Sequence, residues 1–155
     1  MRRSFYLTML LMLLVPMAAR CQFTRCEVAA APVSFGSYAP FSAQASASTG
    51  TVTIRCDLLK MGAYTIELSS GLSGSLSGRQ MSSGQARLSY QLYLNSAHTT
   101  VWGDGTNGTS EAAGNGLSCG VSCDNSYTVY GSIPAQQTTL PTGTYSDSIT
   151  VTVIY

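Results

Sequence analysis

The sequence predicts an all-β protein, a sandwich of short antiparallel strands. No stretch after residue 22 shows helical periodicity, and strand-like runs recur between breaks rich in Gly, Ser and Asn. We expect about seven such strands, a pattern that is typical of β-sandwich domains. A chain of 155 residues is one domain in size.

The expected strands follow one another along the chain. They are Cys26–Phe35, Thr51–Cys56, Ala63–Leu68, Arg87–Leu94, Thr99–Trp102, a run that begins at Tyr127, and a closing run over residues 148–155. In Ala63–Leu68 the apolar residues alternate with polar ones, and the same holds for Arg87–Leu94. Residues 71–84 and 103–125 are expected to be loops because Gly, Ser and Asn dominate them.

The closing run has one apolar face and one polar face. The apolar face is formed by Ile149, Val151, Val153 and Tyr155. Because the run stops at the last residue of the sequence, we expect its neighbour to be an earlier strand or another molecule. An open apolar edge is something that proteins usually cover.

The first 21 residues are expected to be a signal peptide. Two arginines precede the apolar run Phe5–Val15, which is too short for a membrane span of about 20 residues. Cleavage after Cys21 fits the small-x-small rule and leaves Gln22 as the first mature residue. The alternative is a lipoprotein acylated on Cys21, but Arg20 stands where a small residue is expected.

The cysteine count agrees with export to an oxidising compartment. Cleavage removes Cys21 and leaves an even set of four: Cys26, Cys56, Cys119 and Cys123. Four cysteines allow three pairings, and we favour Cys26–Cys56 with Cys119–Cys123. The first two border predicted strands, whereas the last two can close a small local loop. The alternative use of Cys119 and Cys123 as half of a zinc site would need the other two as ligands.

Residues 22–155, the expected mature domain, carry five basic and seven acidic side chains. The resulting net charge is about −2, and no basic patch is present to bind nucleic acid or anionic lipid. The composition therefore excludes nucleic acid as a partner.

No group of residues supports an enzyme. Residues 116–120 match the G-x-S-x-G pattern, but they lack the strand before and the helix after that a nucleophile elbow needs. The only histidine, His98, precedes them and is expected at a surface turn. Asp104 and Asp124 are expected to cap turns, since they lack the ligand spacing of a calcium loop. We therefore expect no catalytic residues, no metal and no cofactor.

Several ordered motifs resemble the spore coat protein U domain family. They are Cys26-x9-Phe35-Gly-Ser-Tyr38, Gly50-Thr-Val-Thr-Ile-Arg-Cys56, Tyr64-Thr-Ile-x-Leu68-Ser-x-Gly71, Arg79-x-Met81, Leu88-x-Tyr90-x-Leu-Tyr93, Trp102-Gly-Asp-Gly105, Tyr127-Thr-Val-Tyr-Gly131 and Gly143-Thr-Tyr-Ser-Asp147. Their order covers essentially the whole expected mature chain.

This family includes subunits of archaic, Csu-type chaperone–usher pili and proteins of spore coats. The resemblance implies an incomplete immunoglobulin-like sandwich that lacks its last strand. It implies a periplasmic chaperone, an outer-membrane usher and neighbouring pilin subunits as partners, with secretion through the periplasm to a cell-surface pilus. The missing strand would be added along Ile149–Tyr155, with Tyr155 at the mouth of the acceptor groove.

One departure from the pilin pattern suggests a special position in the fibre. Only Gln22–Arg25 would precede Cys26 after cleavage, too few residues to donate a strand at about 3.3 Å per residue. We therefore expect a structural or adhesive subunit that accepts a strand without donating one, at a fibre tip or cap. The alternatives are a spore- or cell-surface coat protein of the same fold and, more remotely, a periplasmic carbohydrate-binding module.

Overall fold

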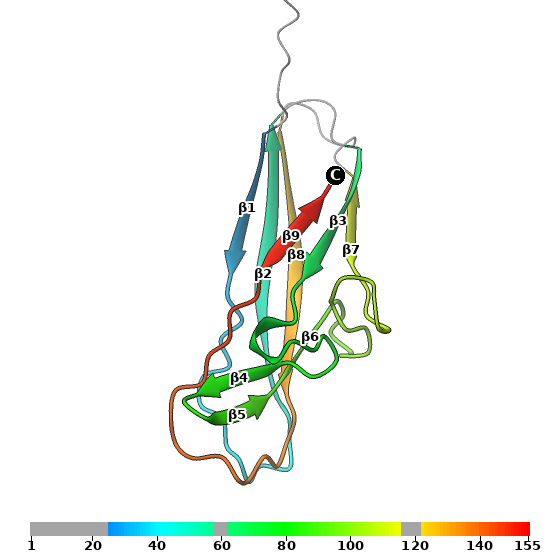
Figure 1. Cartoon of the computed structure of the whole chain (residues 1–155). Coiled ribbons are helices and arrows are strands. Elements are labelled where there is room, and N and C mark those ends of the chain that lie inside the picture. The colour runs from blue at the N-terminus through cyan, green and yellow to red at the C-terminus, as the bar shows by residue number, and fades with distance from the viewer. Residues whose placement is uncertain (1–24, 58–61, 116–121) are drawn as a thin grey trace, which may run out of the picture.

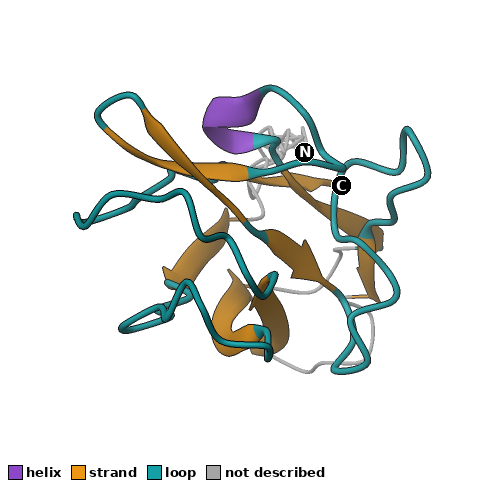
Figure 2. Cartoon of the chain, turned by 90° about the horizontal axis from the view of Figure 1, so that it is seen from below, coloured by secondary structure: helices purple, strands orange, loops and turns teal. Residues whose placement is uncertain are grey.

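The computed structural model describes residues 25–57, 62–115 and 122–155, and it confirms the all-β fold (Figure 1). The strands are β1 (Arg25–Ala31), β2 (Ser46–Asp57), β3 (Ala63–Leu68), β4 (Gln80–Ser83), β5 (Ala86–Ser89), β6 (Gln91–Tyr93), β7 (Ala112–Asn115), β8 (Ser122–Ile133) and β9 (Val151–Ile154). Within these ranges the only helical element is η1 (Gly71–Ser73), a short 3-10 turn that Figure 2 draws in purple. No helix in the described ranges is long and apolar enough to cross a membrane.

Two antiparallel sheets form the sandwich. One has the strand order β1-β2-β8-β6, and the other has the order β7-β3-β9. The hairpin β4–β5 forms a small third sheet. In Figure 1 the long strands β2 and β8 run side by side along the molecule, and β9 is drawn between that sheet and β3. The edge strand β1 of the first sheet lies on the same side of the sandwich as the edge strand β9 of the second, since Ala30 and Ala31 of β1 line one hollow together with Val151 of β9.

The core lies between the two sheets and is built by alternation along their strands. Ile54 on β2 and Ile66 on β3 are almost fully buried, as the two-residue period of a strand predicts. Trp102, which follows an irregular segment, is also fully buried. Its indole N–H donates a 2.8 Å hydrogen bond to the carbonyl of Ile66, which satisfies the polar atom of an otherwise apolar side chain.

A buried arginine joins the lower end of β3 to the segment at Trp102. The Arg79 guanidinium is inaccessible to solvent and donates to the carbonyls of Leu68, Ser69 and Trp102 and to Oε1 of Gln91 at 2.6 to 3.2 Å. Burial lowers the pKa of this side chain from its ordinary value. Because all four acceptors are uncharged, the cation depends on complete hydrogen bonding, and the backbone at both sites is held in place.

The structure differs from the sequence prediction in several segments. The expected strand Thr99–Trp102 is not a strand, and it contributes only the isolated bridges Tyr93↔Val101 and Trp102↔Ser110. The expected loop 71–84 ends in strand β4, and the expected loop 103–125 contains β7 and the first residues of β8. The expected single strand Arg87–Leu94 is divided at Tyr90, because β5 pairs with β4 whereas β6 pairs with β8. The apolar alternation nevertheless continues through the break, and Leu88, Tyr90 and Leu92 are all buried.

Candidate functional site

The outer edge of β9 is open. Its inner edge pairs antiparallel with β3 in the register from Thr65↔Ile154 to Leu68↔Val151. Across the described part of the chain, no strand is hydrogen-bonded to its other edge. The backbone N–H and C=O groups along such an edge are free to pair with an added strand.

An apolar groove of about 350 Å³ lies between the edge of β9 and the edge of β1. Its lining comes from both sheets and from the segment that leads into β9: Ala30, Ala31, Pro32, Val33, Phe35, Thr51, Val52, Leu68, Met81, Tyr90, Leu92, Val129, Tyr145, Ser146, Asp147, Ile149 and Val151. Most of the floor belongs to the hydrophobic core. The groove is therefore a place where the core is accessible between two strand edges.

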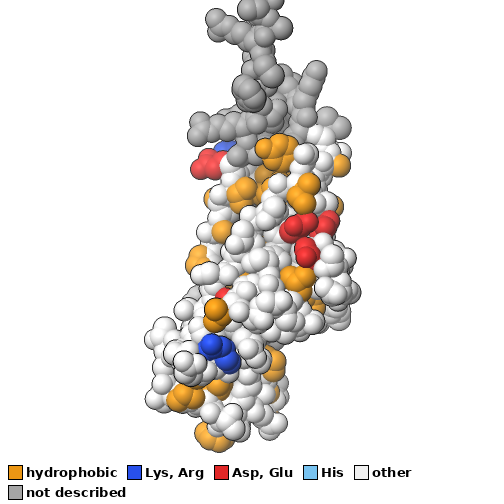
Figure 3. Space-filling model, in the orientation of Figure 1, with side chains coloured by type: hydrophobic (Ala, Val, Ile, Leu, Met, Phe, Trp, Pro, Cys, Tyr) orange, Lys and Arg blue, Asp and Glu red, His pale blue; other side chains and the backbone are white. Residues whose placement is uncertain are grey.

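Large apolar side chains are exposed on the two strands that flank the groove. Val28 on β1 is 42% exposed, and Tyr155, which follows β9, is 72% exposed; Ile154 is 51% exposed on the other face of β9, which it shares with Thr152. In Figure 3 hydrophobic side chains are visible on the face where β9 lies. Exposed apolar groups beside an open strand edge are typical of a surface that another chain covers.

The lower end of the groove is held by the Asp147 carboxylate. Its Oδ2 accepts a 2.7 Å hydrogen bond from the Tyr90 hydroxyl, and its Oδ1 accepts one of 2.8 Å from the Leu72 N–H of η1. Burial, together with this carboxylate, raises the pKa of Tyr90 well above its ordinary value, so the phenol stays protonated. Gly71 has φ 63°, and a Cβ there would collide with Asp147. Both the positive φ and the lack of space for a Cβ therefore require glycine at position 71.

The family comparison covers nearly the whole chain. Residues 13–152 match the model of the Spore Coat Protein U domain. The chain belongs to this family. The search of curated proteins found no match.

A solved structure is similar to this family member in fold. It is a chain of the CsuC–CsuE chaperone–tip adhesion subunit pre-assembly complex, from the archaic chaperone-usher Csu pili of Acinetobacter baumannii. The TM-score is 0.58 at 26% sequence identity, and the match covers 85% of this chain and 40% of that chain. This similarity identifies the pilin-like β-sandwich, while the present chain spans less than half of the chain it matches.

The four residues predicted to form the acceptor groove of this family member lie at different depths. Ile149 and Val151 line the groove, and Val153 is partly buried against the core. Tyr155 is mostly exposed, at the end of β9. The side chains of β9 thus alternate as the sequence analysis expected, with Thr152 on the opposite face.

The predicted cysteine pairs remain predictions. The strand register sets Cys26 opposite Cys56, and Cys56 in turn opposite Cys123, so three cysteines stand in one row across β1, β2 and β8. Cys119, the proposed partner of Cys123, lies outside the described residues, as do Cys21 and Gln22 at the predicted cleavage site.

Sequence reasoning missed the other wall of the groove. Ala30, Ala31 and Val33 line it from β1 and the segment that follows. A run of small residues without alternation gives no sign of which residues face a groove. Asp147 appeared only within a family motif, and only the structure relates it to Tyr90.

The remaining candidates from the sequence play structural roles where they are described. Asp104 accepts a hydrogen bond from the N–H of Thr106 and caps a turn, as expected. The turn expected at Asp124 is wrong, because Asp124 lies in β8 and pairs with Arg55 at 2.8 Å. His98 sits at a turn with φ 54° beside the ring of Tyr93. Among the described residues no group of three or more His, Cys, Asp or Glu could hold a metal ion. The G-x-S-x-G pattern, residues 116–120, lies outside the described residues.

Proposed function

We propose that this protein is a subunit of a chaperone–usher pilus, secreted through the periplasm and displayed at the cell surface, and that it is completed by a strand from a partner. The observation that carries the proposal is the open edge of β9 beside the apolar groove. The partner is a periplasmic chaperone first and a neighbouring pilin subunit after exchange at an outer-membrane usher.

Strand addition accounts for both features of the site. The backbone groups of an incoming strand would pair with the free edge of β9, and every second side chain would enter the groove. Burying one large aliphatic side chain there contributes about 1.5–3 kcal/mol. A segment with alternating large apolar residues is therefore the occupant that the groove accepts, since a charged side chain would be desolvated among core residues such as Val52 and Leu92.

The Csu structure supports this assignment. That structure is a pre-assembly complex of a chaperone with a tip adhesion subunit. Its match covers 85% of the present chain.

The finer proposal is that the subunit receives a strand without donating one, at a fibre tip or cap. It depends on the predicted cleavage after Cys21, which would leave only Gln22–Arg25 ahead of Cys26. Four residues span about 13 Å when extended. Mass spectrometry of the mature protein measures the N-terminus directly, and a start well upstream of Gln22 would remove the basis of this finer proposal.

Periplasmic co-expression tests strand acceptance. The full chain is expressed alone and together with a candidate pilus chaperone, and soluble yield and complex formation are measured by size-exclusion chromatography. We expect a one-to-one complex and a large loss of soluble protein without the chaperone. A soluble, monomeric and fully stable protein in the absence of any partner would contradict the proposal.

A further inference from the structure

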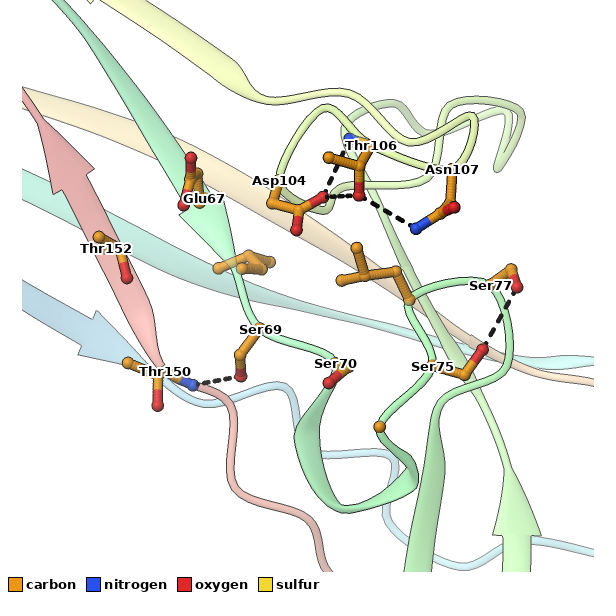
Figure 4. Close-up of a pocket in the computed structure, with 13 residues that line it drawn as sticks. Glu67, Ser69, Ser70, Ser75, Ser77, Asp104, Thr106, Asn107, Thr150 and Thr152 are labelled. Atoms are coloured by element: carbon orange, nitrogen blue, oxygen red, sulfur yellow. Dashed lines mark hydrogen bonds between the residues drawn. The ribbon is translucent and has the colours of Figure 1, made fainter.

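A second hollow of the molecule lies on the opposite face of β9. We call it the polar cleft; its volume is about 680 Å³, and most of its lining is hydroxyl, carboxylate or amide groups (Figure 4). Thr152 lines it from β9 and Thr150 from the residue before that strand, while Glu67 lines it from β3 and Ser69 from the residue after β3. Because side chains alternate along β9, Ile149 and Val151 line the apolar groove while their neighbours line the cleft.

The loop on the far side of the cleft presents a fixed carboxylate. Oδ1 of Asp104 accepts hydrogen bonds from the Thr106 hydroxyl at 2.6 Å and from the Thr106 N–H at 2.9 Å. The Asn107 amide donates to the same hydroxyl at 3.1 Å. Figure 4 shows these residues opposite Ser69 and Thr150 across the cleft. The second oxygen of Asp104 is left to accept from a ligand.

The opposite wall is fixed as well. Ser69 Oγ accepts a 2.9 Å hydrogen bond from the N–H of Thr150, which ties this hydroxyl to β9. Beneath the cleft, Arg79 binds the carbonyls of Ser69 and Trp102, and so holds the chain on both sides of the cleft at once. A cleft whose walls are held before binding loses little conformational entropy when a ligand enters.

The charge of the cleft selects against anions. Its lining contains Glu67 and Asp104 and no basic side chain. Desolvation and the nearby Glu111 and Asp104 carboxylates raise the pKa of Glu67. Figure 3 shows acidic side chains gathered on the flank where β3 and β7 lie. A phosphate, sulfate or sialic acid group would be repelled.

We propose that the polar cleft binds an uncharged carbohydrate. A carboxylate fixed at one oxygen can accept from a ligand hydroxyl at the other, and the serine and threonine hydroxyls can both donate and accept. The volume lies within the range of about 300–1,000 Å³ that is usual for small-ligand sites. Leu76, which is half-buried, supplies an apolar patch for the C–H face of a sugar ring. The site is separate from the apolar groove, so the inference does not depend on the proposed function.

An array of neutral, sialylated, sulfated and amino-sugar oligosaccharides provides the probe. The full chain is applied as isolated, with its chaperone if it requires one. We expect binding to neutral oligosaccharides, weakened about tenfold or more by Asp104→Ala and by Thr152→Val. The matched control Thr138→Val alters an exposed loop residue outside the cleft and should bind like the unchanged protein.

Each result of this experiment decides the inference. Binding of sialylated, sulfated or cationic amino sugars alone would overturn it, and so would an absence of binding to every glycan or neutral binding that both variants leave intact. Asp104→Ala could also weaken binding by disturbing the turn that Asp104 caps. Thr152→Val lies on β9 and leaves that turn unchanged, so it tests the cleft independently. Chaperone capture of all variants should be unchanged, which distinguishes failure here from failure of the strand-acceptor proposal.

Discussion

The Tyr90 hydroxyl donates a 2.7 Å hydrogen bond to Asp147, and so joins the core to the segment that leads into β9. The same carboxylate receives the N–H of Leu72. The position at which β9 leaves the loop is thus fixed by a polar contact at the lower end of the apolar groove, while apolar packing holds the strand itself.

The first prediction concerns this contact. Asp147→Ala removes the acceptor of three hydrogen bonds, from Tyr90, Leu72 and Ser148. It also leaves the Tyr90 hydroxyl without its partner in a buried setting. We expect a loss of about 2–3 kcal/mol in the free energy of unfolding, since hydrogen bonds to charged groups contribute about 1.5–3 kcal/mol. Denaturant unfolding of the protein as isolated measures it. Tyr90→Phe should cost less, and a double variant no more destabilised than Asp147→Ala would demonstrate the coupling.

The second prediction concerns the acceptor groove. Val151→Asp places a charge among the apolar lining, so we expect chaperone capture to fail and the protein to be degraded in the periplasm. The matched control Thr144→Asp adds the same charge to an exposed residue of the preceding loop and should accumulate normally. Immunoblots of periplasmic extracts compare the two. Normal levels of Val151→Asp would show that the groove is not where the chaperone binds.

The third prediction is a pH dependence at Glu67. Its pKa is raised in the folded protein, so its ionisation costs stability once the pH rises through that value. Glu67→Gln removes this cost, and we expect a higher midpoint of thermal unfolding at pH 7. The difference should shrink as the pH falls to the ordinary value of a glutamate and below, where the folded and unfolded chains are both protonated.

Glu27→Gln is the matched control for that experiment, because Glu27 is an exposed residue of β1, a strand that does not line the polar cleft. Its midpoint should follow that of the unchanged protein at every pH. A Glu67→Gln variant that is less stable than the unchanged protein at neutral pH would contradict the raised pKa.

The fourth prediction concerns the cysteines. Peptide mapping under non-reducing conditions should find Cys26 joined to Cys56 and Cys119 joined to Cys123. In the chain-entropy model the longer loop contributes about 3–4 kcal/mol, so replacing Cys26 and Cys56 together by serine should lower the free energy of unfolding by about that amount. Since Cys56 also stands opposite Cys123 in the register, a Cys56–Cys123 peptide is the finding that would replace this assignment.

Where local pattern and burial agree, the sequence was sufficient to predict the fold. The alternation of Tyr64, Ile66 and Leu68 gave the bounds of β3, and the pattern in the closing run identified the two faces of β9. The strand prediction missed β4 and β7, whose side chains are mostly small or polar. The residues of β4 and β7 include serine, alanine and glycine, whose pairing depends on partners distant in the sequence.

The candidate site shows the same division. Ile149 and Val151 could be assigned to the groove from the alternation of apolar and polar residues in the closing run. The wall at Ala30 and Ala31 shows no such alternation, so the sequence did not identify it. The division of the run at Tyr90 was likewise hidden, because the alternation continues while the strand changes from one sheet to another. Contacts between sheets decide such features, and a single strand does not encode them.

β9 forms a wall of two hollows, with Val151 toward one and Thr152 toward the other. A slip of one residue in its register with β3 would therefore exchange both surfaces together, setting threonine hydroxyls against the core and valine into the cleft. Insertions or deletions between Asp147 and Val151 should be tolerated poorly even though this segment is largely irregular. The number of residues between Asp147, which is fixed by its hydrogen bonds, and β9 determines which side chains of β9 face the apolar groove and which face the polar cleft.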